Sequence, residues 1–97
     1  MSDPAECATM SELRAGIDAI DQELIALLAR RAGFIDRAIE LKPAEGIPAN
    51  APDRVEQVVC NVRRLAADCA LAPDLAESLW RILIDWSIER EERVLGR

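Results

Sequence analysis

The chain has 97 residues, enough for one small domain. Hydrophobic residues make up 51% of it and aromatic residues only 3%, so its apolar content is mostly aliphatic, which favours an all-α protein. The formal net charge of −6, with no run of Lys and Arg, argues against nucleic acid as a partner.

The cysteine content and the N-terminal residues indicate where in the cell the protein is expected. The three cysteines, Cys7, Cys60 and Cys69, are odd in number, and the chain has neither CxxC spacing nor a His to complete a metal site. Residues 1–10 lack a basic-then-apolar signal pattern, and no apolar stretch approaches about 18 residues. We expect free thiols, no bound metal, no membrane association and a cytoplasmic location.

A long first helix is predicted between the N-terminus and Pro43. Thr9 and Glu12 have the spacing of a capping box, so the helix should begin near Met10 or Ser11. It should run for about 30 residues, or about 45 Å, before the first proline that follows. Apolar residues recur at 3-4 spacing throughout: Leu13, Ile17, Ile20, Leu24, Leu27, Leu28, Ile35 and Ala38.

The length of this helix predicts an oligomer. A compact monomer of this chain length has a radius of gyration of only about 12–13 Å, so a rod of about 45 Å must protrude from its own domain. A second subunit is then needed to cover the apolar stripe. We therefore expect residues 1–97 to form a single helical domain that assembles into an intertwined helical homodimer.

Two further helices are expected after a short connector at residues 43–52. Pro52 suits a first helical turn, and the second helix should extend to about Cys69. Pro73 should open a third helix that reaches about Leu95. This third helix is apolar on two faces, so we expect it to be buried among helices of both subunits. The faces are Leu75, Leu79, Ile82, Leu83 and Trp86, and Trp80, Ile84, Ile88 and Leu95.

Two cations lie on the apolar stripe of the first helix. Arg31 and Lys42 are eleven residues apart, which places them within about 20° of one another around the helix and about 16 Å apart along it. Burial of two unpaired cations is costly, so an anionic ligand or protein carboxylates should meet them. The alternative is that nearby acids pair with them or that their stems extend to water.

Glu91 is a similar anomaly on the third helix, because the face that carries Ile84 and Ile88 passes through it. Ser87 lies one turn earlier on the same side. The Glu91 carboxyl is either an ion-pair partner for Arg31 or Lys42, or a group that faces a ligand. Arg14 lies about 25 Å from Arg31 along the helix, so only Arg14 of a second subunit is expected to share a site with Arg31.

Several segments together resemble the all-helical chorismate mutase family over nearly the whole chain. The resemblance rests on combined spacings and basic residues. The opening residues and the loop Ile47-Pro48-Ala49 look most like its isochorismate pyruvate lyase branch. The matching segments are Leu13-Arg14-x-x-Ile17-Asp18-x-Ile20-Asp21, Leu27-Leu28-x-Arg30-Arg31, Lys42, and Pro52-Asp53-Arg54-Val55.

The resemblance implies a role for each charged residue. Arg31, Arg54 and Arg14 of the partner subunit would grip the two carboxylates of a small dicarboxylate substrate. Lys42 would face the breaking ether oxygen, Glu91 stands where the family usually has Gln, and a binding residue, Ser87, would lie nearby. A Claisen rearrangement transfers no proton and needs no nucleophile, so no metal or cofactor is expected.

Two departures from the family pattern affect the choice of substrate. Mutases of the family commonly have acids where this chain has Ala51 and Val55, and one of those acids contacts the substrate hydroxyl. A third departure is Glu91, which can donate a hydrogen bond only when protonated. Chorismate mutase activity is the favoured prediction. Elimination of pyruvate from isochorismate and a helical dimer that only binds a ligand or partner remain as alternatives.

Overall fold

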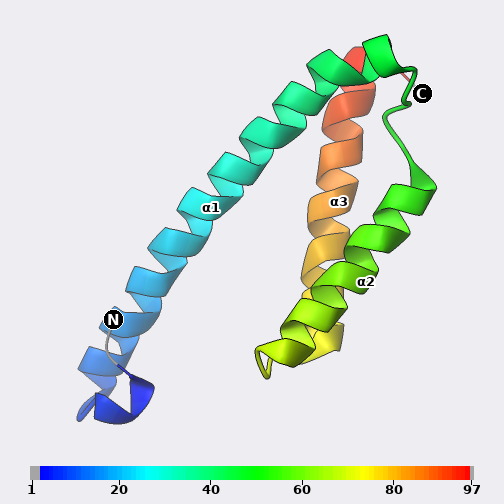
Figure 1. Cartoon of the computed structure of the whole chain (residues 1–97). Coiled ribbons are helices and arrows are strands. Elements are labelled where there is room, and N and C mark those ends of the chain that lie inside the picture. Colours follow the sequence, from blue (N-terminus) through cyan, green and yellow to red (C-terminus); the bar gives the residue numbers. More distant parts are fainter. Residues whose placement is uncertain (1–2, 97) are drawn as a thin grey trace. The chain divides into compact units, whose positions relative to one another are not determined.

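The computed structural model describes residues 3–96, and all of its regular structure there is helical. A short 3-10 helix, η1 (Pro4–Glu6), precedes α1 (Met10–Glu45), α2 (Pro52–Asp68) and α3 (Pro73–Leu95) (Figure 1). The all-α class with three main helices and a long first one is confirmed. The domain predicted for residues 1–97 includes residues 1, 2 and 97, which lie outside the described range. The chain divides into two compact units, unit 1 (Met1–Phe34) and unit 2 (Ile35–Arg97).

The start of α1 is fixed by the predicted capping box. The Thr9 Oγ1 accepts a hydrogen bond from the Glu12 N–H at 3.2 Å. The Glu12 Oε2 in turn accepts from the Ala8 N–H at 2.9 Å, one residue further back than in the usual box. The first bond satisfies one of the backbone donors that a helix start otherwise leaves open, and α1 begins at Met10 as expected.

The end of α1 corrects the prediction that the connector begins at Pro43. The helix continues through Pro43 to Glu45. It ends in a Schellman motif, in which the Ile47 N–H donates to the Lys42 carbonyl at 3.0 Å and the Gly46 N–H donates to the Pro43 carbonyl at 3.3 Å. Gly46 takes the left-handed conformation, with φ +68°, that this ending requires. The helix therefore stops where a glycine permits the reversal, and Pro43 costs it only one bond in its last turn.

In unit 2, α2 and α3 lie side by side and are joined by a tight turn (Figure 1). Pro52 and Pro73 open the two helices, as the sequence predicts. The turn after α2 is a second Schellman motif, with the Leu71 N–H donating to the Ala66 carbonyl at 2.8 Å. Ala70 occupies the left-handed position at φ +58°, where glycine is usual, so a local cost of about 1 kcal/mol is expected there.

Small residues form much of the core of unit 2. Val59 and Ala66 of α2 are buried, as are Ala76 and Ile84 of α3 and Ala49 of the connector. Beside this core, guanidinium groups join the two helices. Arg63 contacts both Asp74 and Glu77 at 2.9 Å. This network is partly exposed, so we expect it to fix the pairing of the helices more than to stabilise the fold.

Unit 1 taken by itself does not cover the apolar stripe of α1. No residue of α1 is buried. Large hydrophobic side chains such as Leu24, Ile25 and Leu27 are half exposed or more. Within residues 3–96, no helix combines the length and hydrophobicity that crossing a membrane requires.

Candidate active site

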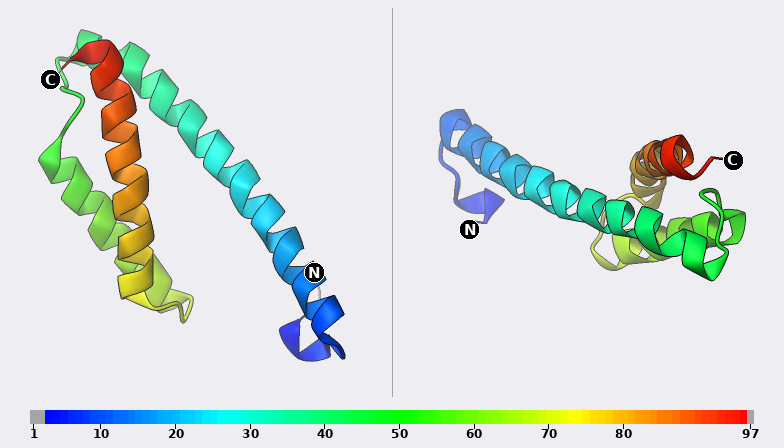
Figure 2. Two further views of the ribbon diagram at one scale, coloured as in Figure 1. Left: turned by 180° about the vertical axis from the view of Figure 1, so that it is seen from behind. Right: turned by 90° about the horizontal axis from the view of Figure 1, so that it is seen from above.

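Lys42 is the only lysine in the chain, and it lies near the end of α1, in unit 2. Its side chain is only 19% exposed, as predicted from its place on the apolar stripe. The ammonium Nζ lies 2.8 Å from the Glu91 Oε1 and donates to the Ala49 carbonyl at 3.0 Å. Figure 2 shows the end of α3 beside the end of α1 and the connector, and the two contacts of the Lys42 ammonium join these three segments.

Glu91 is among the most buried polar residues described, with 4% of its surface exposed. It shares the buried side of α3 with Ile84 and Ser87, as the periodicity of that helix predicts. Its Oε1 is buried and accepts no hydrogen bond from the described residues, although the Lys42 Nζ is close. The contact is therefore an ion pair without hydrogen-bond geometry. Of the cations that the sequence offered as partners, the structure places Lys42 against Glu91.

Ser87 and Arg54 also lie in unit 2, but no described contact joins either of them to Lys42. The Ser87 hydroxyl, one turn before Glu91, donates to the Leu83 carbonyl of its own helix at 2.8 Å. Arg54, in the first turn of α2, is exposed, and its Nη1 donates to the Gln57 Oε1 at 2.6 Å. Both side chains are held locally, and their predicted binding roles remain predictions.

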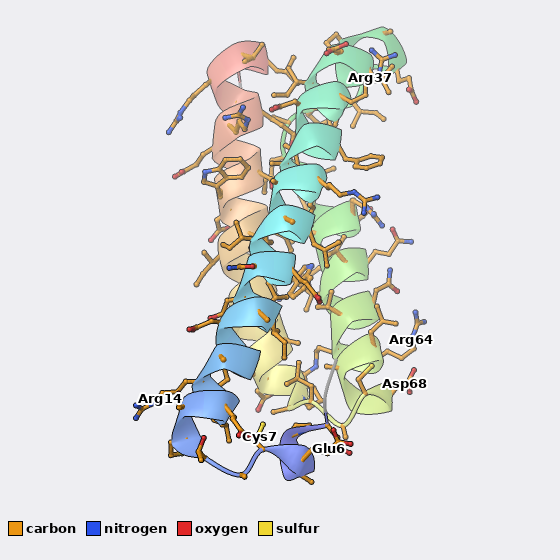
Figure 3. All side chains as sticks on the ribbon, turned by 90° about the vertical axis from the view of Figure 1, so that its left-hand side faces the viewer. Glu6, Cys7, Arg14, Arg37, Arg64 and Asp68 are labelled. Atoms are coloured by element: carbon orange, nitrogen blue, oxygen red, sulfur yellow. The ribbon has the colours of Figure 1, made fainter. Side chains whose placement is uncertain are left out.

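Arg14 and Arg31 belong to unit 1, whereas the other predicted site residues belong to unit 2. Arg14 is exposed, and Figure 3 shows its side chain extending away from α1. Arg31 is partly buried. Among residues 3–96, no carboxylate forms an ion pair with either arginine. Neither guanidinium group therefore has an internal counterion within residues 3–96.

A second ion pair, which the sequence did not reveal, links α1 to α3 beside Glu91. The Arg90 Nε donates to the Asp36 Oδ1 at 2.5 Å and the Nη2 donates to the Oδ2 at 3.2 Å. The hydrogen bond from Arg90 holds the pKa of the Asp36 carboxyl below its usual value. The periodicity of the first helix places Asp36 on its polar face, away from the apolar stripe. Periodicity places a residue on a face but does not identify a partner 54 positions away.

Unit 2 thus holds a cation, Lys42, and an acid, Glu91, that are both largely buried between helices. The chain has no His, and no group of three or more potential metal ligands occurs among the described residues. A largely buried ammonium of this kind can stabilise negative charge more strongly than one in water.

Residues 13–92 match the family model for type II chorismate mutase. This match covers most of the chain, including all three helices for most of their length and every predicted site residue. The chain belongs to the type II chorismate mutase family.

Curated relatives carry more than one activity in their names. The chain is similar to an isochorismate pyruvate lyase of Pseudomonas aeruginosa, with 30% identity over 94% of this chain and 89% of the relative. A chorismate mutase of Methanocaldococcus jannaschii is 29% identical over 78% of this chain and 77% of the relative. A 4-amino-4-deoxychorismate mutase of Streptomyces venezuelae is 31% identical over 91% and 85%. Similar identities thus accompany three different activities.

Proposed function

We propose that this chain catalyses the Claisen rearrangement of chorismate to prephenate in a cationic pocket that binds the dicarboxylate substrate. The observation that carries the proposal is the single lysine, held largely buried against Glu91 and the Ala49 carbonyl. A family match that includes both side chains supports it.

The chemistry requires positive charge near the breaking ether bond. In the rearrangement no proton moves, so a protein accelerates it by holding the compact substrate conformer and stabilising charge that develops on the ether oxygen. An ammonium has three N–H donors. Ala49 and Glu91 engage at most two of those of Lys42 among the described contacts, so one is available for the substrate.

The two substrate carboxylates require further cations. Arg31, Arg54 and Arg14 of a partner subunit are proposed as binding residues, and Arg14 and Arg31 have no internal counterion among the described residues. Guanidinium groups bind carboxylates through two parallel hydrogen bonds, which suits this task. Ser87 is proposed as a further binding residue because it shares the buried side of α3 with Glu91.

The same proposal includes an intertwined homodimer. The stripe of unit 1 exposes Ile17, Leu24 and Leu27 by about half of their surface. A contiguous apolar stripe of this kind usually marks a protein interface. A second copy of this chain would cover it and would supply Arg14. A cytoplasmic location is also proposed, because the three cysteines are unpaired.

The second candidate function is elimination of pyruvate from isochorismate. The lyase relative that covers 94% of this chain supports it, as does the presence of Ala51 and Val55 where mutases of the family commonly have acids. Both reactions are pericyclic and use the same cationic pocket. A third reading is a helical dimer that binds a ligand or partner without turnover.

One set of assays separates these readings. The purified protein is incubated separately with chorismate and isochorismate, and with 4-amino-4-deoxychorismate because of the Streptomyces relative. Loss of substrate is followed by absorbance, and products are identified by chromatography. Prephenate formation supports the mutase. Pyruvate and salicylate in equal amounts support the lyase, and saturable binding without any product supports the non-catalytic reading.

A further inference from the structure

Two ion pairs of opposite polarity join the last part of α1 to α3 within unit 2. Asp36 of α1 receives hydrogen bonds from Arg90 of α3, and Lys42 of α1 lies against Glu91 of α3. Arg90 and Glu91 are consecutive residues. The acid is on α1 in the first pair and on α3 in the second.

This alternation specifies how α3 faces α1. Consecutive helical residues point about 100° apart, so a rotation of α3 by one residue would turn Arg90 toward the direction that Glu91 now occupies. Arg90 would then meet Lys42, and two cations would oppose each other. A rotation of α3 by one residue in the opposite sense would bring Glu91 toward Asp36, and two acids would then oppose each other. Only the observed register satisfies both pairs.

The contacts of the Asp36–Arg90 pair fix the orientation of the Arg90 side chain. Both oxygens of the carboxylate accept from the same guanidinium, through Nε at 2.5 Å and Nη2 at 3.2 Å. Trp86, one turn earlier on α3, supports the guanidinium from another side, with the Arg90 Cζ 5.2 Å from the ring centroid. Because both charged side chains are nearly half exposed, the pair adds little stability. Its fixed orientation is therefore its more important property.

Lys42 gains from such support because its hydrogen bond to the Ala49 carbonyl ties it to the connector and not to α3. Its side chain has four rotatable bonds, and its contact with the buried Glu91 Oε1 lacks hydrogen-bond geometry. The position of the ammonium therefore depends both on Ala49 and on where α3 presents the Glu91 carboxyl. A displacement of about 1 Å at a reacting centre can cost up to about 100-fold in rate.

We propose that Asp36, Arg90 and Trp86 form a clamp that positions Glu91, and through it the Lys42 ammonium. They are positioning residues, since none of them contacts Lys42 in the described structure. The effect on turnover rests on the proposed function. The effect on Lys42 itself does not, because it concerns only the local geometry of unit 2.

The test compares Arg90→Lys with a matched control, Arg63→Lys. Both substitutions keep the positive charge and remove a guanidinium that joins two helices, but Arg63 joins α2 to α3 and has no described contact with the clamp. The first readout is the rate at which a small amine-reactive ester acylates Lys42. Lys42 is the only lysine of the parent protein, and mass spectrometry of the peptide that contains it distinguishes its acylation from that of the lysine that each substitution adds. The second readout is kcat and KM for the active substrate, with helix content from circular dichroism.

Arg90→Lys is expected to raise the Lys42 acylation rate several-fold and to lower kcat about tenfold, with KM changed less than about twofold. Arg63→Lys should change neither. If Arg90→Lys unfolds the protein, Asp36→Asn takes its place, because it keeps the shape of the acceptor and removes the charge. Equal acylation rates in the clamp variants and the control would overturn the proposal, as would a kcat that does not change. Absence of turnover in the parent protein would defeat the proposed function, while the acylation rates would still decide the clamp.

Discussion

The two units of the chain carry similar apolar patterns but differ in what covers them. In unit 2, the apolar faces of α2 and α3 meet, and Val59 and Ile84 are buried. In unit 1, the stripe of α1 has the same helical spacing, yet no residue of that helix is buried. Phe34, the last residue of unit 1, has 74% of its surface exposed.

This difference shows that a helical stripe predicts a buried face without saying which molecule buries it. Each half-exposed Leu or Ile side chain leaves about 1 kcal/mol of hydrophobic stabilisation unrealised. In unit 2 the same chain covers the face of α3 that carries Ile84, whereas Leu75, Leu79 and Ile82 on its other face are about half exposed or more. Unit 1 by itself supplies no cover for its stripe, which is why the proposed homodimer is the central structural prediction. Arg14 and Arg31 belong to unit 1, and Lys42 and Glu91 belong to unit 2.

The largest effect is expected from placing a charge on the uncovered stripe. Leu24→Asp should convert a dimer at micromolar concentration into a largely unfolded monomer, because an unpaired carboxylate buried at the interface costs roughly 3 to 5 kcal/mol. Gln22→Asp, on the polar side of the same helix, is the control and should remain dimeric. Sedimentation velocity and circular dichroism measure both. A well-folded monomer of the parent protein would contradict the dimer proposal.

The next effect concerns one predicted cation from each unit. Arg31→Ala and Lys42→Ala should each lower kcat/KM by about 100-fold to 1,000-fold, because both cations are proposed to bind or stabilise negative charge. Lys42→Ala should also lower the melting temperature, since it leaves the buried Glu91 without its cation. Arg37→Ala is the control on the same helix, because Arg37 forms an exposed pair with Glu40. Near-normal activity in either site variant would remove that residue from the site.

A smaller effect is expected at Glu91, where the family usually has Gln. A carboxylate paired with Lys42 accepts hydrogen bonds and cannot donate one to the ether oxygen. Glu91→Gln supplies a donor of similar shape and should raise activity several-fold above the parent at about pH 7 to 8. Glu89→Gln, on the exposed side of α3, should leave activity unchanged. If the Gln variant gains nothing, Glu91 serves only as the ion-pair partner of Lys42.

The smallest effect is the pH dependence of stability at Asp36. Its pKa is lowered in the folded state by Arg90, so the pair stabilises the fold above the unfolded pKa of about 3.9 and this contribution is lost as pH falls through the folded value. Asp36→Asn should therefore melt slightly below the parent at pH 7, and the difference should shrink in acid. Thermal melts at both ends of that range test this. A difference that is independent of pH would show that the charge of Asp36 is irrelevant.

Much of the fold could be predicted because its boundaries are local signals. Thr9 with Glu12 marks the start of α1, and Pro52 and Pro73 mark the starts of the next two helices. The predicted end of α1 was wrong, and the reason is also local. The helix continues through Pro43 although proline removes one of its hydrogen bonds, and Gly46, three residues later, provides the conformation that ends it.

The site was predictable only where a charge interrupts an apolar face. Lys42 and Glu91 are such interruptions. They form an ion pair, which is one of the two interpretations that the sequence allowed for Glu91. The sequence does not single out Asp36 and Arg90, because each lies on a helix face where charged residues are common. Their contact depends on how α3 packs against α1, which sequence periodicity does not specify.

The most direct test of the account mixes two inactive variants, Arg14→Ala and Arg31→Ala. In a homodimer with shared sites, each heterodimer has one site with both arginines and one site with neither. Random exchange makes about half of the dimers mixed, so activity should recover to about a quarter of the parent value. Exchange is verified by native mass spectrometry with one variant isotopically labelled, and each variant alone is the control. Recovery near that fraction is the predicted result. No recovery after verified exchange would contradict a cationic pocket built from both subunits.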